Sequence, residues 1–249
     1  MPIDIQEQNW NNFCDRHLHD WHGIWTSYSA QGEVKDSFQS LRSFRANSEK
    51  TQITHTNRYI YADGNIEEKT WQLQKPFLRS IFFPQGAGTF HAEKLVADSF
   101  FAVEFFFIHK NLRHSAIAAY ANGKNLTGIW SIREDSTGFP SQHWSSNLDL
   151  VSERSLSENW TGTSVTMTPD LKVSPAVPAN LNWQIEGNEL FFFPDEISLS
   201  CPKQVELGKQ IALAATWLVH SSYMQQITIE YNELGGFQSL KFAEFTCEV

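Results

Sequence analysis

The sequence predicts an all-β protein built of two consecutive antiparallel β-barrels, with a short capping helix at the N-terminus. Most of the chain alternates apolar and polar residues with a period of two, in short runs separated by turn residues. The first half alone contains about nine such runs with short connections, which is typical of a closed barrel rather than an open sheet. A motif of Trp21, Gly23 and Trp25 recurs in weaker form as Trp160 and Gly162. We interpret each copy as a first strand, in which the glycine permits close backbone approach and the large ring closes the barrel floor.

The first predicted element is an amphipathic helix over residues 5–18. One face of this helix carries Trp10, Phe13, Cys14, His17 and Leu18. We expect the helix to cap the open end of the first barrel. After it, the alternation predicts strands at 25–29, 34–45, 51–61, 66–74, 79–83, 88–95, 99–107, 112–120 and 126–134. The pair Asp63-Gly64, between the third and fourth of these strands, is the strongest hairpin signal in the chain.

A polar segment from residue 135 to residue 158 shows no sustained period and is interpreted as the linker. The sequence therefore predicts a first barrel with its helix at 1–145 and a shorter second barrel at 146–249. A proline-rich loop is expected at 169–178. The predicted strands of the second half are 160–168, 181–186, 189–193, 197–200, 204–207, 211–219, 225–231 and 236–245.

An internal repeat supports this division. Phe82-Phe83-Pro84 is echoed by Phe192-Phe193-Pro194 in the second half. His109 and His220, and likewise Tyr120 and Tyr231, are separated by nearly the same number of residues. We interpret the three matches as a duplication.

Composition and charge exclude several classes of partner. The chain of 249 residues is 41% hydrophobic and 14% aromatic, which supplies enough apolar material for packed cores. Its net charge of −9 argues against binding to nucleic acid or to an anionic membrane surface. The three cysteines form no Cys-x-x-Cys pair, which argues against disulfides and thiolate metal sites. The longest apolar run, 100–108, is far shorter than the ~20 residues of a membrane helix, and no secretory signal is seen. We expect a cytoplasmic protein without membrane insertion.

Several motifs resemble those of a known β-barrel family. Gly23-Ile24-Trp25 on a first strand, with Arg133 near the end of the last strand, resembles the lipocalin and wider calycin pattern. Motifs at 19–25, 56–64, 163–170, 191–195 and 200–202 resemble a calycin-like family of mostly uncharacterised cyanobacterial and plastid proteins. This resemblance covers nearly the whole chain and implies two calycin-like barrels, a photosynthetic source and a Trp25 ring packed under Arg133. Its plastid relatives include an assembly factor for the chloroplast ATP synthase, and it supplies no catalytic residues. The second copy departs from the pattern, so its floor must be sealed differently.

The densest histidine cluster is His17, His19 and His22. A metal site requires converging imidazoles, but a helix brings residues i and i+3 together and a strand residues i and i+2. No single element gathers all three rings. We therefore expect packing and capping roles, and no metal site.

Glu104 stands among phenylalanines in the run 99–107. If this carboxyl group is buried, its pKa rises unless a cation pairs with it. The next strand offers Arg113 and His114 on opposite faces, so one of them shares the side of Glu104. A structural ion pair is the favoured interpretation, and the alternative is general acid or base chemistry with Glu104, Arg113 and His114 as catalytic residues.

Arginines and aromatic residues gather on the early strands of the first barrel. On alternating strands some of them must point inward, and such an interior would suit an amphipathic or carboxylate-bearing ligand. Solvated outer faces should account for at least half of these residues. The predicted ligand-binding residues are Arg42, Arg58, Tyr59, Tyr61, Trp71, Glu104 and Arg113.

Two classes of function remain open. The first is a non-enzymatic binding protein, either a carrier of a small hydrophobic or amphipathic ligand or an assembly factor with a protein partner in a photosynthetic complex. The second is a cofactor-independent isomerase or cyclase, or a chromophore lyase, acting inside the first barrel. The sequence lacks the usual motifs of nucleotide sites, phosphate sites, serine hydrolases and zinc proteases, so no cofactor is expected and the binding protein is favoured.

Overall fold

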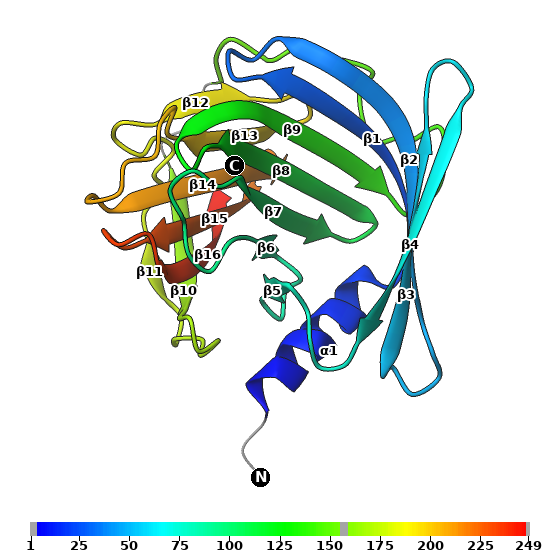
Figure 1. The fold of residues 1–249 in the computed structure, drawn as a ribbon, viewed down its shortest axis with the longest axis horizontal. Helices are drawn as coiled ribbons and strands as arrows, with labels where there is room; N and C mark the ends of the chain where they lie inside the picture. Colours follow the sequence, from blue (N-terminus) through cyan, green and yellow to red (C-terminus); the bar gives the residue numbers. More distant parts are fainter. Residues whose placement is uncertain (1–3, 155–158, 248–249) are drawn as a thin grey trace.

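The computed structural model describes residues 4–154 and 159–247, which form one N-terminal helix and two antiparallel sheets (Figure 1). The all-β class and the helix are thereby confirmed. The helix is α1 (Ile5–His17), and Asp4 caps it by accepting a hydrogen bond from the Gln6 amide. The nine strands of the first sheet are β1 (Asp20–Ser29), β2 (Val34–Ala46), β3 (Gln52–Ile60), β4 (Ile66–Gln74), β5 (Ser80–Phe82), β6 (Gly88–Phe90), β7 (Phe101–His109), β8 (Leu112–Ala121) and β9 (Asn125–Asp135).

The first sheet has the order β4-β3-β2-β1-β9-β8-β7-β6-β5 and curls strongly (Figure 1). Within the described ranges, its end strands β4 and β5 do not pair with each other, and α1 bridges this side of the sheet. The Asn9 side chain donates to the Ser80 carbonyl and accepts from the Phe82 amide, while the Trp10 indole donates to the Lys50 carbonyl. The amphipathic helix is therefore present as predicted, and its apolar face packs against the sheet beside the gap between β4 and β5.

The second sheet has the order β11-β10-β16-β15-β14-β13-β12. The segment β10-β16-β15-β14-β13-β12 repeats the pairing order β1-β9-β8-β7-β6-β5 of the first sheet, so the sequence repeat has a structural counterpart. His109 and His220 end the equivalent strands β7 and β14, and their rings contact each other. The strands are β10 (Trp160–Met167), β11 (Val177–Ala179), β12 (Glu189–Phe192), β13 (Ile197–Cys201), β14 (Ile211–His220), β15 (Tyr223–Tyr231) and β16 (Phe237–Cys247).

The two sheets share the largest cluster of buried apolar side chains. Tyr28 of the first sheet packs on Phe193, and Phe107 of β7 packs on Trp217 of β14, with ring centroids 5.3 and 6.3 Å apart. The predicted boundary between 145 and 146 falls in the connection between β9 and β10. A division into two domains stays a prediction, and residues 155–158 of the predicted linker lie outside the described residues.

Two predicted strands of the second half are wrong. Residues 181–186 alternate as a strand does, but they cross the outer face of the second sheet, where Leu181 and Trp183 pack against the cluster of Met224 and Phe245. The strand of this region is instead β11, which begins within the last residues of the predicted proline-rich loop and ends just after it. Residues 204–207 form only one bridge, from Gln204 to Asn125. In both segments the period of two reflects alternating contacts with a neighbouring surface rather than pairing along a sheet.

His114 is buried between the sheets, beside Trp144 and Trp217. Burial, together with the smaller effect of the Arg133 charge, lowers the pKa of its imidazole to about 3. The folded protein therefore holds this ring neutral, while the unfolded chain protonates it below a pH of about 6.5.

We expect the free energy of unfolding to fall as the pH is lowered from 7.5 to 5, because the unfolded chain then binds the proton that folded His114 rejects. The contribution of this residue at pH 5 is about 2 kcal/mol. The variant His114→Phe retains a ring that does not titrate. In this variant the loss of unfolding free energy between pH 7.5 and 5 should be smaller by about 2 kcal/mol. Urea unfolding at the two pH values measures it, and an unchanged pH dependence in the variant would contradict the burial of a neutral imidazole.

Candidate functional site

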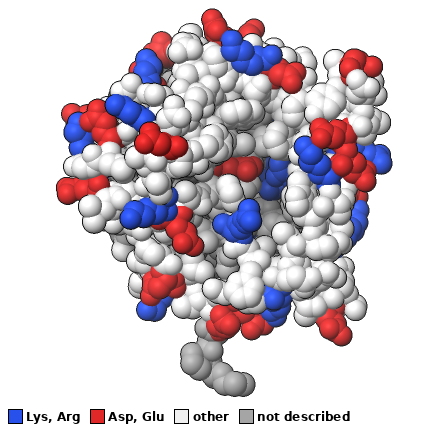
Figure 2. Space-filling model, viewed as in Figure 1, with Lys and Arg blue, Asp and Glu red and all other residues white. Residues whose placement is uncertain are grey.

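The first sheet, α1 and the segment before β5 line a cavity of about 620 Å³ that opens at the molecular surface. Figure 2 shows that the molecule is hollowed near the centre of one face, with basic and acidic side chains inside the hollow. The cavity walls are largely aromatic, and they also include polar groups from β2, β3, β7 and β8. The lining residues used below are Trp25, Arg42, Phe44, His55, Asn57, Phe90, Glu104, Phe106 and Arg113.

Strand register decides which side chains point inward. Trp21 lies opposite Arg42 on β2, and Trp25 lies opposite Phe38, so the alternate residues of β1 and β2 share one face. The guanidinium carbon of Arg42 lies 5.1 Å from the centroid of the Trp25 ring. The guanidinium carbon of Arg113 lies 5.9 Å from the Trp21 ring. The two tryptophans of the opening motif thus cover two arginines at the cavity floor.

The arginine implied by the calycin resemblance is a different one. Arg133 lies opposite Ile24, so it projects from the face of the sheet opposite to Trp25. It forms an ion pair with Asp195 of the β12–β13 turn and donates to the Ser145 carbonyl. The expectation that Trp25 packs under Arg133 is therefore wrong, because neighbouring residues of a strand face opposite ways. Arg133 instead joins the first sheet to the second.

Four charged side chains meet at the cavity floor. Glu134 lies between two arginines: its carboxylate oxygens are 3.3 Å from Nε of Arg42 and 3.3 Å from Nη1 of Arg113. Glu104 is more loosely placed, 3.9 Å from Nη1 of Arg42. Burial raises the pKa of Glu104, although the charges of Arg42 and Arg113 oppose this rise. Burial also lowers the pKa of Arg113 to about 10, so this guanidinium stays charged at neutral pH.

Several buried polar atoms of this group have no hydrogen-bond partner among the described residues. They are Nε of Arg42, Nε and Nη1 of Arg113, Oε1 of Glu104 and both carboxylate oxygens of Glu134. The ion pairs of these side chains balance their charges, but the paired atoms do not meet the geometric requirements of a hydrogen bond. Because buried polar groups are nearly always hydrogen-bonded, the group has spare capacity for a molecule in the cavity.

Gly23 makes room for this arrangement. A Cβ atom at this position would lie 2.9 Å from Oγ of Ser40 and 3.0 Å from Cγ of Glu134. Gly162, its counterpart in the second motif, similarly faces Phe245, whose Cδ1 would lie 2.3 Å from an added Cβ. Trp160, beside it, packs against the Met224 and Phe245 cluster. At both glycines, side chains of the neighbouring strands therefore approach the backbone closely, as the sequence predicts.

The predicted ligand-binding residues separate into four groups. Arg42, Glu104 and Arg113 line the cavity. Tyr59 stacks edge-on against Trp25 just behind the lining. Arg58 lies on the outer face, where it pairs with Glu68 at 3.3 Å, so the structure does not bring it to the cavity. The outer rim holds Tyr61, which donates to Glu67, and Trp71, which packs on His55.

The structure does not bring the catalytic candidates together. Arg113 shares the cavity face with Glu104, but His114 faces the second sheet. The acid and the imidazole therefore cannot act on one molecule. The histidine cluster is also dispersed: His17 bonds to the Gly86 carbonyl, His19 packs edge-on against Trp21, and His22 against Phe139. In residues 4–154 and 159–247 no group of three metal-ligating side chains converges.

Sequence reasoning missed three polar residues of the site. The place of Glu134 depends on strand register, which puts it opposite Arg113 and which no pattern within one strand shows. His55 and Asn57 share the face of Tyr59, and this alternation was their only signal. Burial lowers the pKa of His55 to about 3. Nε2 of His55 is hydrogen-bonded to Oδ1 of Asn57 at 2.9 Å.

With this geometry established, comparison with known proteins gives the family. The model of a "domain of unknown function (DUF3598), N-terminal" matches residues 6–139, more than half of the chain. The chain belongs to the DUF3598 family. Residues 186–245 match the C-terminal domain of "Biogenesis factor required for ATP synthase 1". No curated protein matches this chain. The family resemblance inferred from the motifs is thus confirmed, while the calycin classification stays an interpretation.

A solved structure shows the same fold. The 1.75 Å crystal structure of a DUF3598 protein of unknown function from Nostoc punctiforme PCC 73102 superposes with a TM-score of 0.76. The two chains are 20% identical, and the match covers 96% of this chain and 99% of the other. At this identity the likeness shows the fold alone. No helix in the described ranges of this DUF3598 protein is long and apolar enough to cross a membrane.

We expect Arg113→Met to lower the free energy of unfolding by about 3 kcal/mol, because it leaves two buried carboxyl groups facing one guanidinium. The double variant Arg113→Met, Glu134→Gln keeps one positive and one negative group and should be less destabilised than the single variant. Arg58→Met, on the outer face, serves as the control and should cost no more than about 1 kcal/mol.

Chemical unfolding of the four proteins gives these values. A double variant at least as unstable as Arg113→Met would contradict the coupling between Arg113 and Glu134.

Proposed function

We propose that this DUF3598 protein is a non-enzymatic assembly factor that binds a protein partner. The observation that carries the proposal is the match of residues 186–245 to the C-terminal domain of an ATP synthase biogenesis factor. This segment runs from β12 into β16 and supplies most of the second sheet. The partner complex that the match suggests is an ATP synthase.

The packing of the second sheet favours recognition through its surface. One face of the sheet belongs to the core shared with the first sheet. On the other face Met224, Ala243 and Phe245 are buried, and Leu181 and Trp183 cover them. A sheet filled on both faces leaves only its edges and loops for binding.

Three loops at one end of the molecule carry exposed apolar side chains. The Leu95 amide donates to the Gly235 carbonyl, and the Gly208 amide to the Glu233 carbonyl, so the loops are bound to one another. On them Val96, Leu207 and Leu234 are 52%, 46% and 79% exposed. We name these three residues the loop patch. Exposed apolar groups held on mutually bonded loops suit contact with a protein.

In cells that lack this protein we expect less assembled ATP synthase on native gels, and recovery when the wild-type chain is returned. The variant Leu207→Asp, Leu234→Asp should fail to restore assembly, because binding would desolvate two carboxylates. Ile66→Asp on β4 is the matched control, since Ile66 is also an exposed apolar residue but lies far from these loops in the sequence.

Unchanged ATP synthase in the absence of the protein would contradict the proposed function. Full rescue by the double aspartate variant would show that the loop patch is not the binding surface.

A further inference from the structure

The cavity of the first barrel is a second candidate binding site, independent of the loop patch. Its volume of about 620 Å³ lies within the range of small-molecule sites. Aromatic rings form much of its wall, including Phe44, Phe90 and Phe106. Such a wall suits the apolar body of a ligand rather than a polar metabolite.

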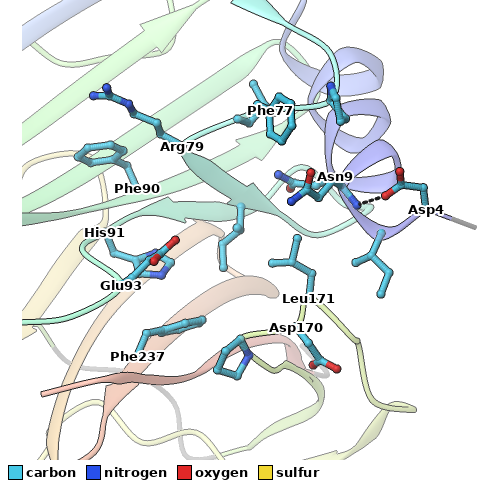
Figure 3. Close-up of a pocket in the computed structure, with 16 residues that line it drawn as sticks. Asp4, Asn9, Phe77, Arg79, Phe90, His91, Glu93, Asp170, Leu171 and Phe237 are labelled. Atoms are coloured by element: carbon cyan, nitrogen blue, oxygen red, sulfur yellow. Dashed lines mark hydrogen bonds between the residues drawn. The ribbon is translucent and has the colours of Figure 1, made fainter. Parts of the chain in front are cut away.

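The cavity adjoins a second, larger pocket of about 1120 Å³, shown in Figure 3. Phe77, Leu78, Arg79 and Phe90 line both hollows, so this short wall forms the boundary between them. Figure 3 shows Arg79 and Phe90 side by side on this wall and Phe77 nearer to α1. Phe77 is largely exposed, which is unusual for a phenylalanine. An apolar chain that extends from the cavity floor to this boundary would meet Phe77 and Phe90.

The cavity floor supplies the polar contact. Arg42 and Arg113 line the cavity and are more than nine-tenths buried. Nε of Arg42 and Nη1 of Arg113 face Glu134 at 3.3 Å, and Nε of Arg113 has no hydrogen-bond partner among the described residues. Glu134 lies between them but does not line the cavity. A molecule at the floor therefore meets two guanidinium groups and the single carboxyl group of Glu104.

The charge of this floor depends on Glu104. When Glu104 is ionised, two positive and two negative charges cancel; when it is protonated, one positive charge remains for an anion. Burial raises the pKa of Glu104, which favours the protonated form. A protonated carboxyl group also becomes a hydrogen-bond donor.

The two histidines nearest to Glu104 do not compete for this proton. Burial lowers the pKa of His55 to about 3 and that of His17 well below its usual value, so both rings are neutral near pH 7. The groups that face Glu104 or its cavity are Arg42 on β2, His55 on β3, Arg79 before β5, Arg113 on β8, Glu134 on β9 and, behind the wall, His17 on α1.

We propose that the first barrel binds the carboxylate of an amphipathic acid at Arg42 and Arg113, and that Glu104 takes up one proton when the acid binds. The O–H of Glu104 then donates to the bound carboxylate, and no covalent bond forms or breaks apart from that proton transfer. The chain of the acid lies between the aromatic walls and points toward Phe77 and Phe90.

Isothermal titration calorimetry with decanoate and with decanol, a neutral molecule of the same chain length, tests the proposal. At pH 6 decanoate should bind at least about tenfold more tightly than decanol, the effect of one charge-assisted hydrogen bond. Above the pKa of Glu104 the affinity for decanoate should fall by about tenfold per pH unit. Titrations in two buffers of different ionisation enthalpy should show the uptake of close to one proton.

The variant Glu104→Gln keeps a hydrogen-bond donor but cannot titrate. It should bind decanoate with no proton uptake and no dependence on pH between 6 and 8, whereas Arg58→Gln on the outer face should behave as the wild type. Three results would overturn the inference. Decanol could bind as tightly as decanoate or more tightly, proton uptake could persist in Glu104→Gln, or neither probe could bind. None of these outcomes bears on ATP synthase assembly, which is measured separately.

Discussion

The structure depends on three strands that are buried on both faces. Strands β7, β8 and β9 direct one set of alternate side chains into the core shared with the second sheet. The other set of β7 and β8 reaches the cavity of the first sheet, and that of β9 places Glu134 against the cavity arginines. Phe105 and Phe107 thus belong to the shared core, while Glu104 and Phe106 face the cavity. A strand buried on both faces shows a nearly continuous apolar run instead of alternation, as residues 100–108 do. The single charged residue of this run, Glu104, lies on the cavity face, where it meets Arg42 of β2.

The same alternation separates structural from binding roles among neighbouring residues. Arg113 lies on the cavity face and His114 on the shared face; Glu134 holds the two cavity arginines, while Arg133 bonds to Asp195 of the second sheet. The equivalent strands β7 and β14 of the two sheets lie against each other, as the contact between His109 and His220 shows. Three further strands, β2 to β4, widen the first sheet around a cavity, whereas the second sheet is covered by residues 181–186 and filled.

Much of the secondary structure could be predicted from the sequence, because turn residues and strong alternation mark the elements. The helix ends one residue earlier than predicted, and the Asp63-Gly64 turn joins β3 to β4 as expected. The candidate site could be predicted only in part. Alternation shows that Arg113 and His114 face opposite ways, but only the register between strands shows which of them joins Glu104. The role of Arg133 also required knowledge of how the sheets pack, which no pattern within one strand contains.

The central claim is that the four charged side chains of the cavity floor keep hydrogen-bonding capacity for a molecule in the cavity. Crystallographic density at Arg42, Glu104, Arg113 and Glu134, at a resolution that defines ordered water, tests it most directly. The account predicts a bound molecule or ordered waters within hydrogen-bond distance of the Arg113 guanidinium. Direct hydrogen bonds among all four side chains, with the aromatic walls closed over them and no space left, would contradict it.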